Sequence, residues 1–190
     1  YNGANEIFTP VNEDVKEEIR RKYSEGKPYF MFVGSLHPRK NLARLFTSFD
    51  IFKKKNNNDI KLVIVGSKRW WTEPIKNAYE AMTFKDDVIF TGRLSAEDLH
   101  LVTASALASV YVSYFEGFGI PIVEAFKCDT PVITSNVTSM PEVAADAALL
   151  VDPFKEESIA EAMEKIMDEN VRKELIEKGR MRRQDFSWDK

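Results

Sequence analysis

The sequence contains a single cysteine, Cys128, and only two histidines, His37 and His100. One cysteine excludes an internal disulfide, and so few cysteine and histidine side chains argue against a zinc site built from them. We therefore expect no metal and no cofactor, and a reducing, cytoplasmic compartment. No apolar run reaches the roughly 18 to 20 residues that span a bilayer, and the first residues do not have the pattern of a signal peptide.

The sequence also lacks an excess of positive charge. It has 27 Lys and Arg against 30 Asp and Glu, a net charge of −3. Proteins that bind nucleic acids usually carry a basic stripe or patch, so we expect no nucleic-acid partner. The one dense basic run, Lys53 to Lys55, is predicted to be the solvated end of a helix.

What the sequence does have is enough apolar material for a core. Its 190 residues are 44% hydrophobic and include thirteen Phe and three Trp, which predicts one globular domain, with two as the alternative. The chain begins at Tyr1 without an initiator Met and stops soon after two aromatic residues, Phe186 and Trp188. We therefore expect it to be cut from a longer protein.

From Tyr29 onward, short apolar runs alternate with amphipathic segments, the βαβ pattern of a parallel sheet with helices on both faces. The fold class expected is α/β, a doubly wound, Rossmann-like parallel sheet of six strands. The predicted strands are Tyr29 to Val33, Ile60 to Val65, Val88 to Thr91, Leu107 to Ser113, Pro131 to Thr134 and Ala148 to Val151. The predicted helices between them are Leu42 to Lys54, Pro74 to Met82, Ala96 to Ser105, Ile120 to Lys127 and Pro141 to Ala145.

The two ends of the chain depart from this alternation. Two consecutive helices are predicted after Asp152, at Ser158 to Glu169 and Val171 to Gln184, with Ser158 capping the first. Residues 1–28 hold one charged helix, Glu13 to Tyr23, and no strand pattern. We interpret 1–28 as a connector with a first helix, and 29–190 as the domain proper.

The most informative stretch is Glu116-Gly-Phe-Gly-Ile-Pro-Ile-Val-Glu124, in which two carboxylates flank a glycine-rich turn and an apolar run. It lies where a predicted strand passes into a predicted helix. In open α/β sheets that crevice binds ligands, and a helix N-terminus there offers free N–H groups to an anion. Glu124 is predicted inside the helix among apolar neighbours, where a carboxylate needs hydrogen-bond donors, and ligand hydroxyls are good candidates.

A second candidate site follows the first strand, at Gly34-Ser-Leu-His-Pro-Arg-Lys-Asn41. Gly34 permits close backbone approach, Arg39 can bind two phosphate oxygens at once, and Lys40 adds a point charge. Asn41 is placed to cap the next helix. The pattern matches neither the Rossmann fingerprint nor the P-loop, so on these residues alone, anion binding and an exposed basic turn remain equal alternatives.

Other polar and aromatic residues have two interpretations each. Arg93, after the third strand, is either a ligand contact or a surface ion-pair partner. His37, in a loop beside two cations, is either a ligand contact or a loop residue without a part in binding. His100, inside a helix, is predicted to be structural. Ser95 and Asp98 form a capping box with Asp in place of Glu. The pair Trp70 and Trp71 is predicted to be a packing cluster rather than an aromatic platform for an acceptor.

Together these motifs resemble the C-terminal, nucleotide-sugar-binding domain of the family 4 retaining glycosyltransferases, which have the GT-B fold. The resemblance covers nearly the whole chain and extends to Asn2-Gly3 and Phe186-Ser187-Trp188 at its ends. The motifs that carry it are Val33-Gly34-Ser35-Leu36 with Lys40-Asn41, Phe90-Thr91-Gly92-Arg93-Leu94, Ser113 with Glu116 to Ala125, Pro131-Val132-Ile133-Thr134, and Met140-Pro141-Glu142-Val143.

The resemblance implies roles for the residues around the two glutamates. Glu116 and the backbone amides of Gly117, Phe118, Gly119 and Ile120 would hold the donor sugar and its diphosphate. Glu124 would bind the ribose hydroxyls. Glu116 would be a positioning group in catalysis, because retention in such enzymes is explained by attack on the face that the diphosphate leaves.

It also implies roles for the loops after the first and third strands. Lys40, the second catalytic residue, would neutralise the leaving diphosphate, with Arg39 or Ser35 beside it and Gly34 close to the phosphates. The base would lie against Arg93 and Leu94.

The chain departs from the family at two positions. Many members have Arg where this chain has Ser35, and Arg39 is the expected substitute. Many also have Gly where this chain has Asp129.

The resemblance implies a hexosyltransferase of bacterial polysaccharide biosynthesis. Its partners would be a UDP- or GDP-hexose and a saccharide or lipid-linked acceptor, the acceptor bound by an N-terminal domain outside this chain. The isolated domain would then be inactive. The longer protein would be cytoplasmic, with peripheral association at the inner membrane face as one alternative. Two other functions stay open: a nucleotide-sugar epimerase of related fold, and a non-catalytic nucleotide-binding module.

Overall fold

A computed structural model describes residues 4–186 of the chain. Asn2, Gly3, Ser187 and Trp188, which the resemblance assigned to a connector and a final helix, lie outside the described residues.

The six predicted strands form one parallel sheet in the order β3-β2-β1-β4-β5-β6, which confirms the predicted fold class. This is the strand order of a doubly wound Rossmann-type sheet, and it reverses between β1 and β4. Each strand agrees with its prediction to within two residues at either end. The strands are β1 Tyr29–Val33, β2 Lys61–Val65, β3 Val88–Gly92, β4 Ala108–Tyr111, β5 Val132–Ser135 and β6 Leu149–Val151.

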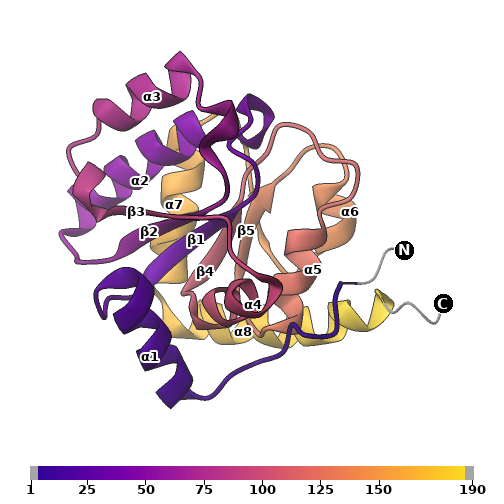
Figure 1. Cartoon of the computed structure of the whole chain (residues 1–190). Helices are drawn as coiled ribbons and strands as arrows, with labels where there is room; N and C mark the ends of the chain where they lie inside the picture. The colour runs from indigo at the N-terminus through magenta and orange to yellow at the C-terminus, as the bar shows by residue number, and fades with distance from the viewer. Residues whose placement is uncertain (1–3, 187–190) are drawn as a thin grey trace.

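Helices cover both faces of this sheet (Figure 1). Helices α2, α3 and α7 pack together on one face, whereas α1, α4, α5 and α6 lie on the other. Helix α8 contacts both α5 and α7 and runs across the lower half of the view in Figure 1. The helices are α1 Glu13–Ser24, α2 Leu42–Asn56, α3 Glu73–Glu80, α4 Ala96–Ser105, α5 Ile120–Lys127, α6 Met140–Ala144, α7 Glu156–Ile166 and α8 Glu169–Arg182.

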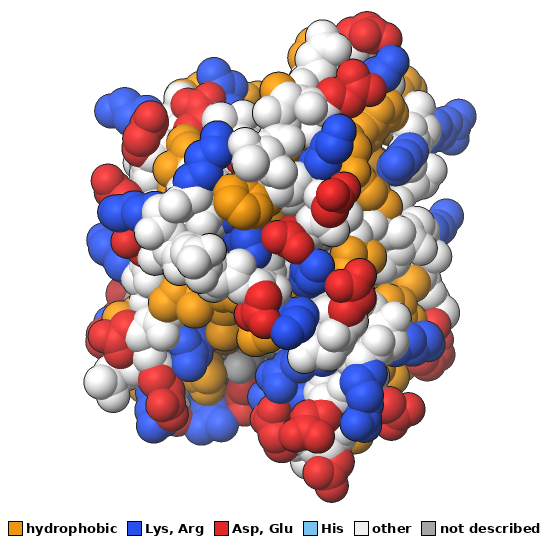
Figure 2. Space-filling model, turned by 90° about the vertical axis from the view of Figure 1, so that its left-hand side faces the viewer, with side chains coloured by type: hydrophobic (Ala, Val, Ile, Leu, Met, Phe, Trp, Pro, Cys, Tyr) orange, Lys and Arg blue, Asp and Glu red, His pale blue; other side chains and the backbone are white. Residues whose placement is uncertain are grey.

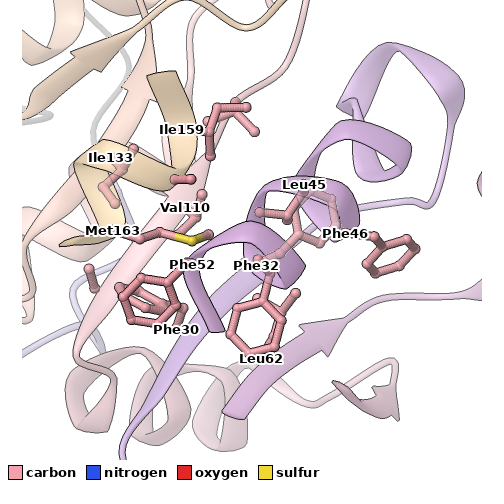
Figure 3. Close-up of a cluster of buried hydrophobic side chains, with 14 of the residues drawn as sticks. Phe30, Phe32, Leu45, Phe46, Phe52, Leu62, Val110, Ile133, Ile159 and Met163 are labelled. Carbon is pink, nitrogen blue, oxygen red and sulfur yellow. The ribbon is translucent and has the colours of Figure 1, made fainter. Parts of the chain in front are cut away.

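Side chains alternate across β1 to supply a core on each face of the sheet. Phe30 and Phe32 point toward α2 and α7, where they pack with Leu45, Phe46 and Met163 (Figure 3). Tyr29 and Met31 point to the opposite face, toward α1 and α4. Because both faces are covered, the strand reads as a continuous apolar run rather than as an alternation of polar and apolar residues.

Two local predictions outside the candidate site were wrong. Ser158 does not cap α7, which begins two residues earlier at Glu156; its hydroxyl instead accepts from the N–H of Asp152 at 3.1 Å. Lys53 is not solvated but 1% exposed. Its ammonium donates to the carbonyl of Ile60 at 3.0 Å and pairs with Asp87 at 2.9 Å, so it closes the turn between α2 and β2.

The turn between α5 and β5 explains one departure from the family pattern. Asp129 has a φ of 55°, in the left-handed region that glycine adopts most readily. Its carboxylate pairs with Arg180 at 2.8 Å and Arg183 at 3.0 Å, both from the C-terminal helical segment. The side chain that glycine lacks therefore fastens this segment to the turn.

Candidate functional site

The predicted site residues lie at the carboxyl edge of the sheet, around the point where the strand order reverses. Strand β1 pairs with both β2 and β4, so the loops that follow β1 and β4 leave the sheet side by side. Ligands of doubly wound folds bind in the crevice between such loops. Here one loop contains the short helix Pro38–Lys40 and the other contains the glycine-rich turn.

Three glycines end the three strands on one side of this crevice. A Cβ on Gly66 would lie 1.8 Å from the carbonyl oxygen of Gly34, so only glycine fits there. Gly66 in turn donates to the carbonyl of Gly92 at 2.9 Å. A cavity of about 390 Å³ lies beside Gly34 and Gly66, and its lining also includes Ser35, Arg93 and Leu94. The structure thus brings together the four residues expected around the base and phosphates, and Arg93 pairs with no carboxylate in the described part of the chain.

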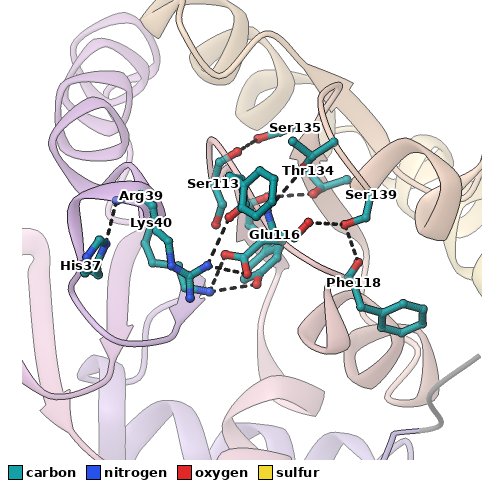
Figure 4. Close-up of polar contacts among 12 residues, drawn as sticks. His37, Arg39, Lys40, Ser113, Glu116, Phe118, Thr134, Ser135 and Ser139 are labelled. Carbon is teal, nitrogen blue, oxygen red and sulfur yellow. Dashed lines mark hydrogen bonds and ion pairs between the residues drawn. The ribbon is translucent and has the colours of Figure 1, made fainter.

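Glu116 is the centre of a charged cluster beside this cavity (Figure 4). Its carboxylate pairs with the ammonium of Lys40 at 2.6 Å and with the guanidinium of Arg39 at 2.8 Å. The side chain is only 9% exposed. Burial by itself would raise the pKa of Glu116, but the contacts with Lys40, Ser113 and Arg39 outweigh it and hold that pKa below its ordinary value. Glu116 is therefore an anion that pairs with both cations expected to bind a diphosphate and leaves a net charge of +1 on the cluster.

Lys40 is enclosed on several sides. Its ammonium donates to the hydroxyl of Tyr111 at 2.9 Å and lies 4.8 Å from the centre of that ring. Its alkyl chain passes Gly34, where a Cβ would come within 3.4 Å of it. Burial lowers the pKa of Lys40, and the contacts with Glu116 offset this only in part. Sequence reasoning missed Tyr111, because in an apolar strand a tyrosine is indistinguishable from a core residue.

Backbone contacts tie the two loops to each other. Arg39 donates from its guanidinium to the carbonyl of Phe115 at 3.2 Å, and its own carbonyl accepts from the N–H of Tyr114 at 2.8 Å. Asn41 does not cap α2 as predicted; it has a φ of 64° and donates to the carbonyls of Val112 and Pro153. Its side chain serves as a bridge between loops, which fixes the position of its neighbour Lys40.

Ser139, which sequence reasoning also missed, stabilises the glycine-rich turn. The hydroxyl of Ser139 reaches the carbonyls of Glu116 at 2.9 Å and Phe118 at 3.0 Å. Gly119 has a φ of 106°, which lets the chain turn directly into α5 at Ile120. The first N–H groups of a helix have no intrahelical acceptor, so this end of α5 can accept an anion.

Glu124 lies one helical turn after Ile120, on the same side of α5. Burial raises the pKa of its carboxyl to about 7, and the nearby Lys127 lowers it only slightly. The carboxyl accepts no hydrogen bond from any group in the described residues. Glu124 does not line the 390 Å³ cavity. A half-buried, unpaired carboxyl near the start of α5 is nevertheless suited to accept hydrogen bonds from a ligand's hydroxyl groups.

Several aromatic, histidine and capping residues were also given predicted roles. Trp71 packs against Phe46, Tyr79 and Phe90, which confirms the packing interpretation, but Trp70 remains 49% exposed, edge-on to His37 at 5.7 Å. His37 caps the short helix through Nδ1, which accepts from the N–H of Arg39. His100 is structural as predicted, contacting the carbonyl of Thr9 at 2.8 Å. Ser95 caps α4 at the N–H of Asp98.

The surface offers no single-sign patch on the face drawn in Figure 2, where acidic and basic side chains are interspersed. Between residues 4 and 186, no cluster of three His, Cys, Asp or Glu side chains is arranged to hold a metal ion. None of the helices in that range has the length and apolarity that crossing a membrane requires.

Comparison with known proteins decides the family. The family model described as glycosyl transferases group 1 matches residues 15–182. The chain belongs to this family. A curated relative, O-antigen chain mannosyltransferase B of Escherichia coli, is 33% identical over 162 residues, covering 85% of this chain and 42% of the relative.

Solved structures show the same architecture. Sucrose-phosphate synthase from Thermosynechococcus elongatus superposes with a TM-score of 0.84 at 27% identity, over 99% of this chain and 48% of that one. Anabaena HepE, solved with UDP and glucose, has a TM-score of 0.86 at 16% identity, over 98% and 52%. The chain thus spans about half the length of the proteins it matches, and the expected GT-B glycosyltransferase resemblance is confirmed.

Proposed function

We propose that this chain is the donor-binding half of a retaining glycosyltransferase, which moves a hexosyl group from a nucleoside diphosphate sugar to a saccharide or lipid-linked acceptor. Residues 29–190 would form the donor domain, and residues 1–28 would connect it to an acceptor-binding domain outside this chain. The name of the Escherichia coli relative favours mannose as the sugar and polysaccharide assembly as the process. The longer protein would then work in the cytoplasm, where nucleotide sugars are available.

The observation that carries the proposal is the arrangement of Lys40, Arg39 and Glu116 beside the 390 Å³ cavity. The two positive charges of Lys40 and Arg39 match the two negative charges of a sugar diphosphate better than they match the single charge of Glu116, so a diphosphate can displace that carboxylate. In the proposed complex the diphosphate takes the place of Glu116 beside Lys40 and Arg39. Glu116 turns to the hydroxyls of the donor sugar and fixes their orientation.

The remaining groups would divide the rest of the donor between them. The base would occupy the cavity against Arg93 and Leu94, and the ribose hydroxyls would donate to Glu124. The amides of Gly117, Phe118, Gly119 and Ile120 would face the phosphates and the sugar, since the start of α5 favours negative charge.

Catalysis would come from stabilising the negative charge that develops on the leaving diphosphate. Lys40 supplies a fixed positive charge in a poorly solvated place, where its effect on an anion is larger than in water. The acceptor would attack on the same face of the sugar, with a donor phosphate oxygen taking its proton. Glu116 and Glu124 lie on one continuous segment, unlike the two carboxyl groups that flank the scissile bond in glycoside hydrolases.

A thermal-shift series with UDP, GDP, ADP and their glucose and mannose conjugates tests the donor site. Stabilisation by one nucleotide, lost in both Lys40→Ala and Glu124→Ala, is expected. Activity is tested separately on the full-length protein by product analysis. A transferred hexose supports the proposal, an epimerised nucleotide sugar or binding without turnover contradicts it, and normal transfer by Glu116→Ala would remove Glu116 from its role.

A further inference from the structure

The environment of Lys40 contains one feature that the proposed diphosphate exchange does not use. The ammonium has two hydrogen-bond partners in the described residues, the carboxylate of Glu116 at 2.6 Å and the hydroxyl of Tyr111 at 2.9 Å. It lies 4.8 Å from the centre of the Tyr111 ring, at the hydroxyl end of that ring. Lys40 itself is 7% exposed, so water can replace either partner only to a small extent.

The two partners differ in how firmly they are placed. Glu116 lies on the loop after β4, next to the exposed residues Phe115 and Gly117. Tyr111 lies in β4 itself, is 2% exposed, and is paired in register with Thr134 of β5. Thr134 also donates to the carbonyl of Tyr111 at 2.8 Å. The tyrosine is thus held by the sheet, whereas the glutamate is held by a loop.

The Tyr111 ring also reaches the glycine-rich turn. A Cβ on Gly119 would lie 3.8 Å from the ring carbon Cε1. Burial, together with the negative charge of Glu116, raises the pKa of the Tyr111 phenol above its ordinary value, so the hydroxyl stays protonated at neutral pH. Its oxygen remains a neutral acceptor for Lys40 whether or not Glu116 is beside it.

We infer that Tyr111 is the positioning residue of Lys40: its hydroxyl keeps the ammonium at the diphosphate position when Glu116 turns away to the donor sugar. This inference rests on the proposed function. Without Tyr111, the buried ammonium would lose its last neutral partner at the step where its charge is required, because a buried cation needs hydrogen-bond acceptors. The effect belongs to the diphosphate alone, since base and ribose contacts lie elsewhere.

Tyr111→Phe removes the hydroxyl and keeps the ring, and Tyr114→Phe removes a neighbouring phenol whose oxygen contacts Arg44 instead. Each variant is titrated by calorimetry with the nucleoside diphosphate that the unmodified chain binds, and with the matching nucleoside. Comparing the two ligands separates the contribution of the diphosphate to affinity from that of the base and ribose. In Tyr111→Phe we expect diphosphate affinity to fall about tenfold with nucleoside affinity unchanged, since a hydrogen bond to a charged group is lost. In Tyr114→Phe both affinities should stay as they are.

Two results would overturn the inference: unchanged diphosphate affinity in Tyr111→Phe, or an equal fall for diphosphate and nucleoside, which would indicate a general structural role. Failure of the proposed function looks different. The unmodified chain would then bind the diphosphate no more tightly than the nucleoside, which would refute the phosphate site and the inference with it.

Discussion

The carboxylate of Glu116 and the ammonium of Lys40 lie 2.6 Å apart although 76 residues separate them in the chain. Parallel strands place them together, because β1 and β4 are neighbours and both residues follow the carboxyl end of their strand. In the absence of donor, the proposed diphosphate site is therefore closed by an internal anion.

Glu116→Gln should bind a free nucleoside diphosphate more tightly than the unmodified chain does. The amide keeps the shape of the side chain but no longer competes with phosphate for Lys40 and Arg39. Calorimetry with UDP and GDP would measure this. Weaker binding by the variant would indicate that Glu116 does not have to be displaced.

The same pair makes stability depend on pH in the acid range. The pKa of Glu116 is lower in the folded state than its ordinary value of 4.5, so the unfolded chain binds the proton first. The stabilisation is fully present above about pH 5 and is lost as the pH falls through the folded value. Urea unfolding between pH 3 and pH 6 should show this loss in the unmodified chain, and a smaller one in Glu116→Gln.

Glu124 should have the opposite pH dependence. Its pKa is raised from 4.5 to about 7, so between these values the folded state keeps a proton that the unfolded state has released. The free energy of unfolding should therefore fall as the pH rises from 4.5 to 7, by on the order of 2 to 3 kcal/mol. Glu124→Gln should abolish this fall and be the more stable protein at pH 8; identical pH profiles would contradict the assignment.

Ionisation of Glu124 should also strengthen ribose binding. An ionised carboxylate accepts hydrogen bonds from both ribose hydroxyls, whereas a protonated one has less acceptor capacity. Nucleoside affinity should be higher at pH 8 than at pH 6 in the unmodified chain and nearly constant in Glu124→Gln. Titration calorimetry at the two pH values measures it, and no pH dependence in the unmodified chain would place the ribose elsewhere.

Asp129 lends itself to a comparison of backbone strain with ion pairing. Asp129→Ala loses the pairs with Arg180 and Arg183 and keeps a left-handed backbone, for an expected cost of about 2 kcal/mol. Asp129→Gly loses the same pairs but relieves the backbone, so it should be about 1 kcal/mol more stable than the alanine variant. Chemical denaturation of both variants would test this. Equal stability would mean that the turn is not strained.

Gly66→Ala should disrupt the cavity, because its Cβ would collide with the carbonyl of Gly34. We expect a loss of several kcal/mol or failure to fold, by the mechanism of steric overpacking. Gly117→Ala is the matched control for stability, since a Cβ there meets nothing within 4 Å. A thermal midpoint for Gly66→Ala equal to that of the control would contradict the close approach of β1 and β2.

The sequence predicts the sheet well because each strand is buried on both faces and stands out as a short apolar run between turn residues. Helices α4 and α5 were predicted with the bounds that the structure has, since Ser95 and the glycine-rich turn mark where they begin. These signals are local. They need no knowledge of which segments meet.

What could not be predicted depends on tertiary neighbours. Lys53 has the composition of a solvated helix end, but two carbonyls of the turn that follows and Asp87, just before β3, surround its ammonium. Ser158 has a side chain suited to capping a helix, but α7 starts two residues earlier. The Ser158 hydroxyl instead accepts a hydrogen bond from the N–H of Asp152. The roles of Tyr111 and Ser139 follow from strand pairing and loop packing, which single residues do not reveal.

The central claim is that the crevice at the carboxyl edge of the sheet binds a nucleoside diphosphate. Titration of the ¹⁵N-labelled chain with UDP and GDP, followed by amide NMR, tests it most directly. One nucleotide should shift the amides of Gly34, Ser35, Arg93, Leu94, Gly117, Phe118, Gly119 and Ile120, and those shifts should be lost in Lys40→Ala. Shifts confined to another part of the fold, or none at millimolar nucleotide, would contradict the claim.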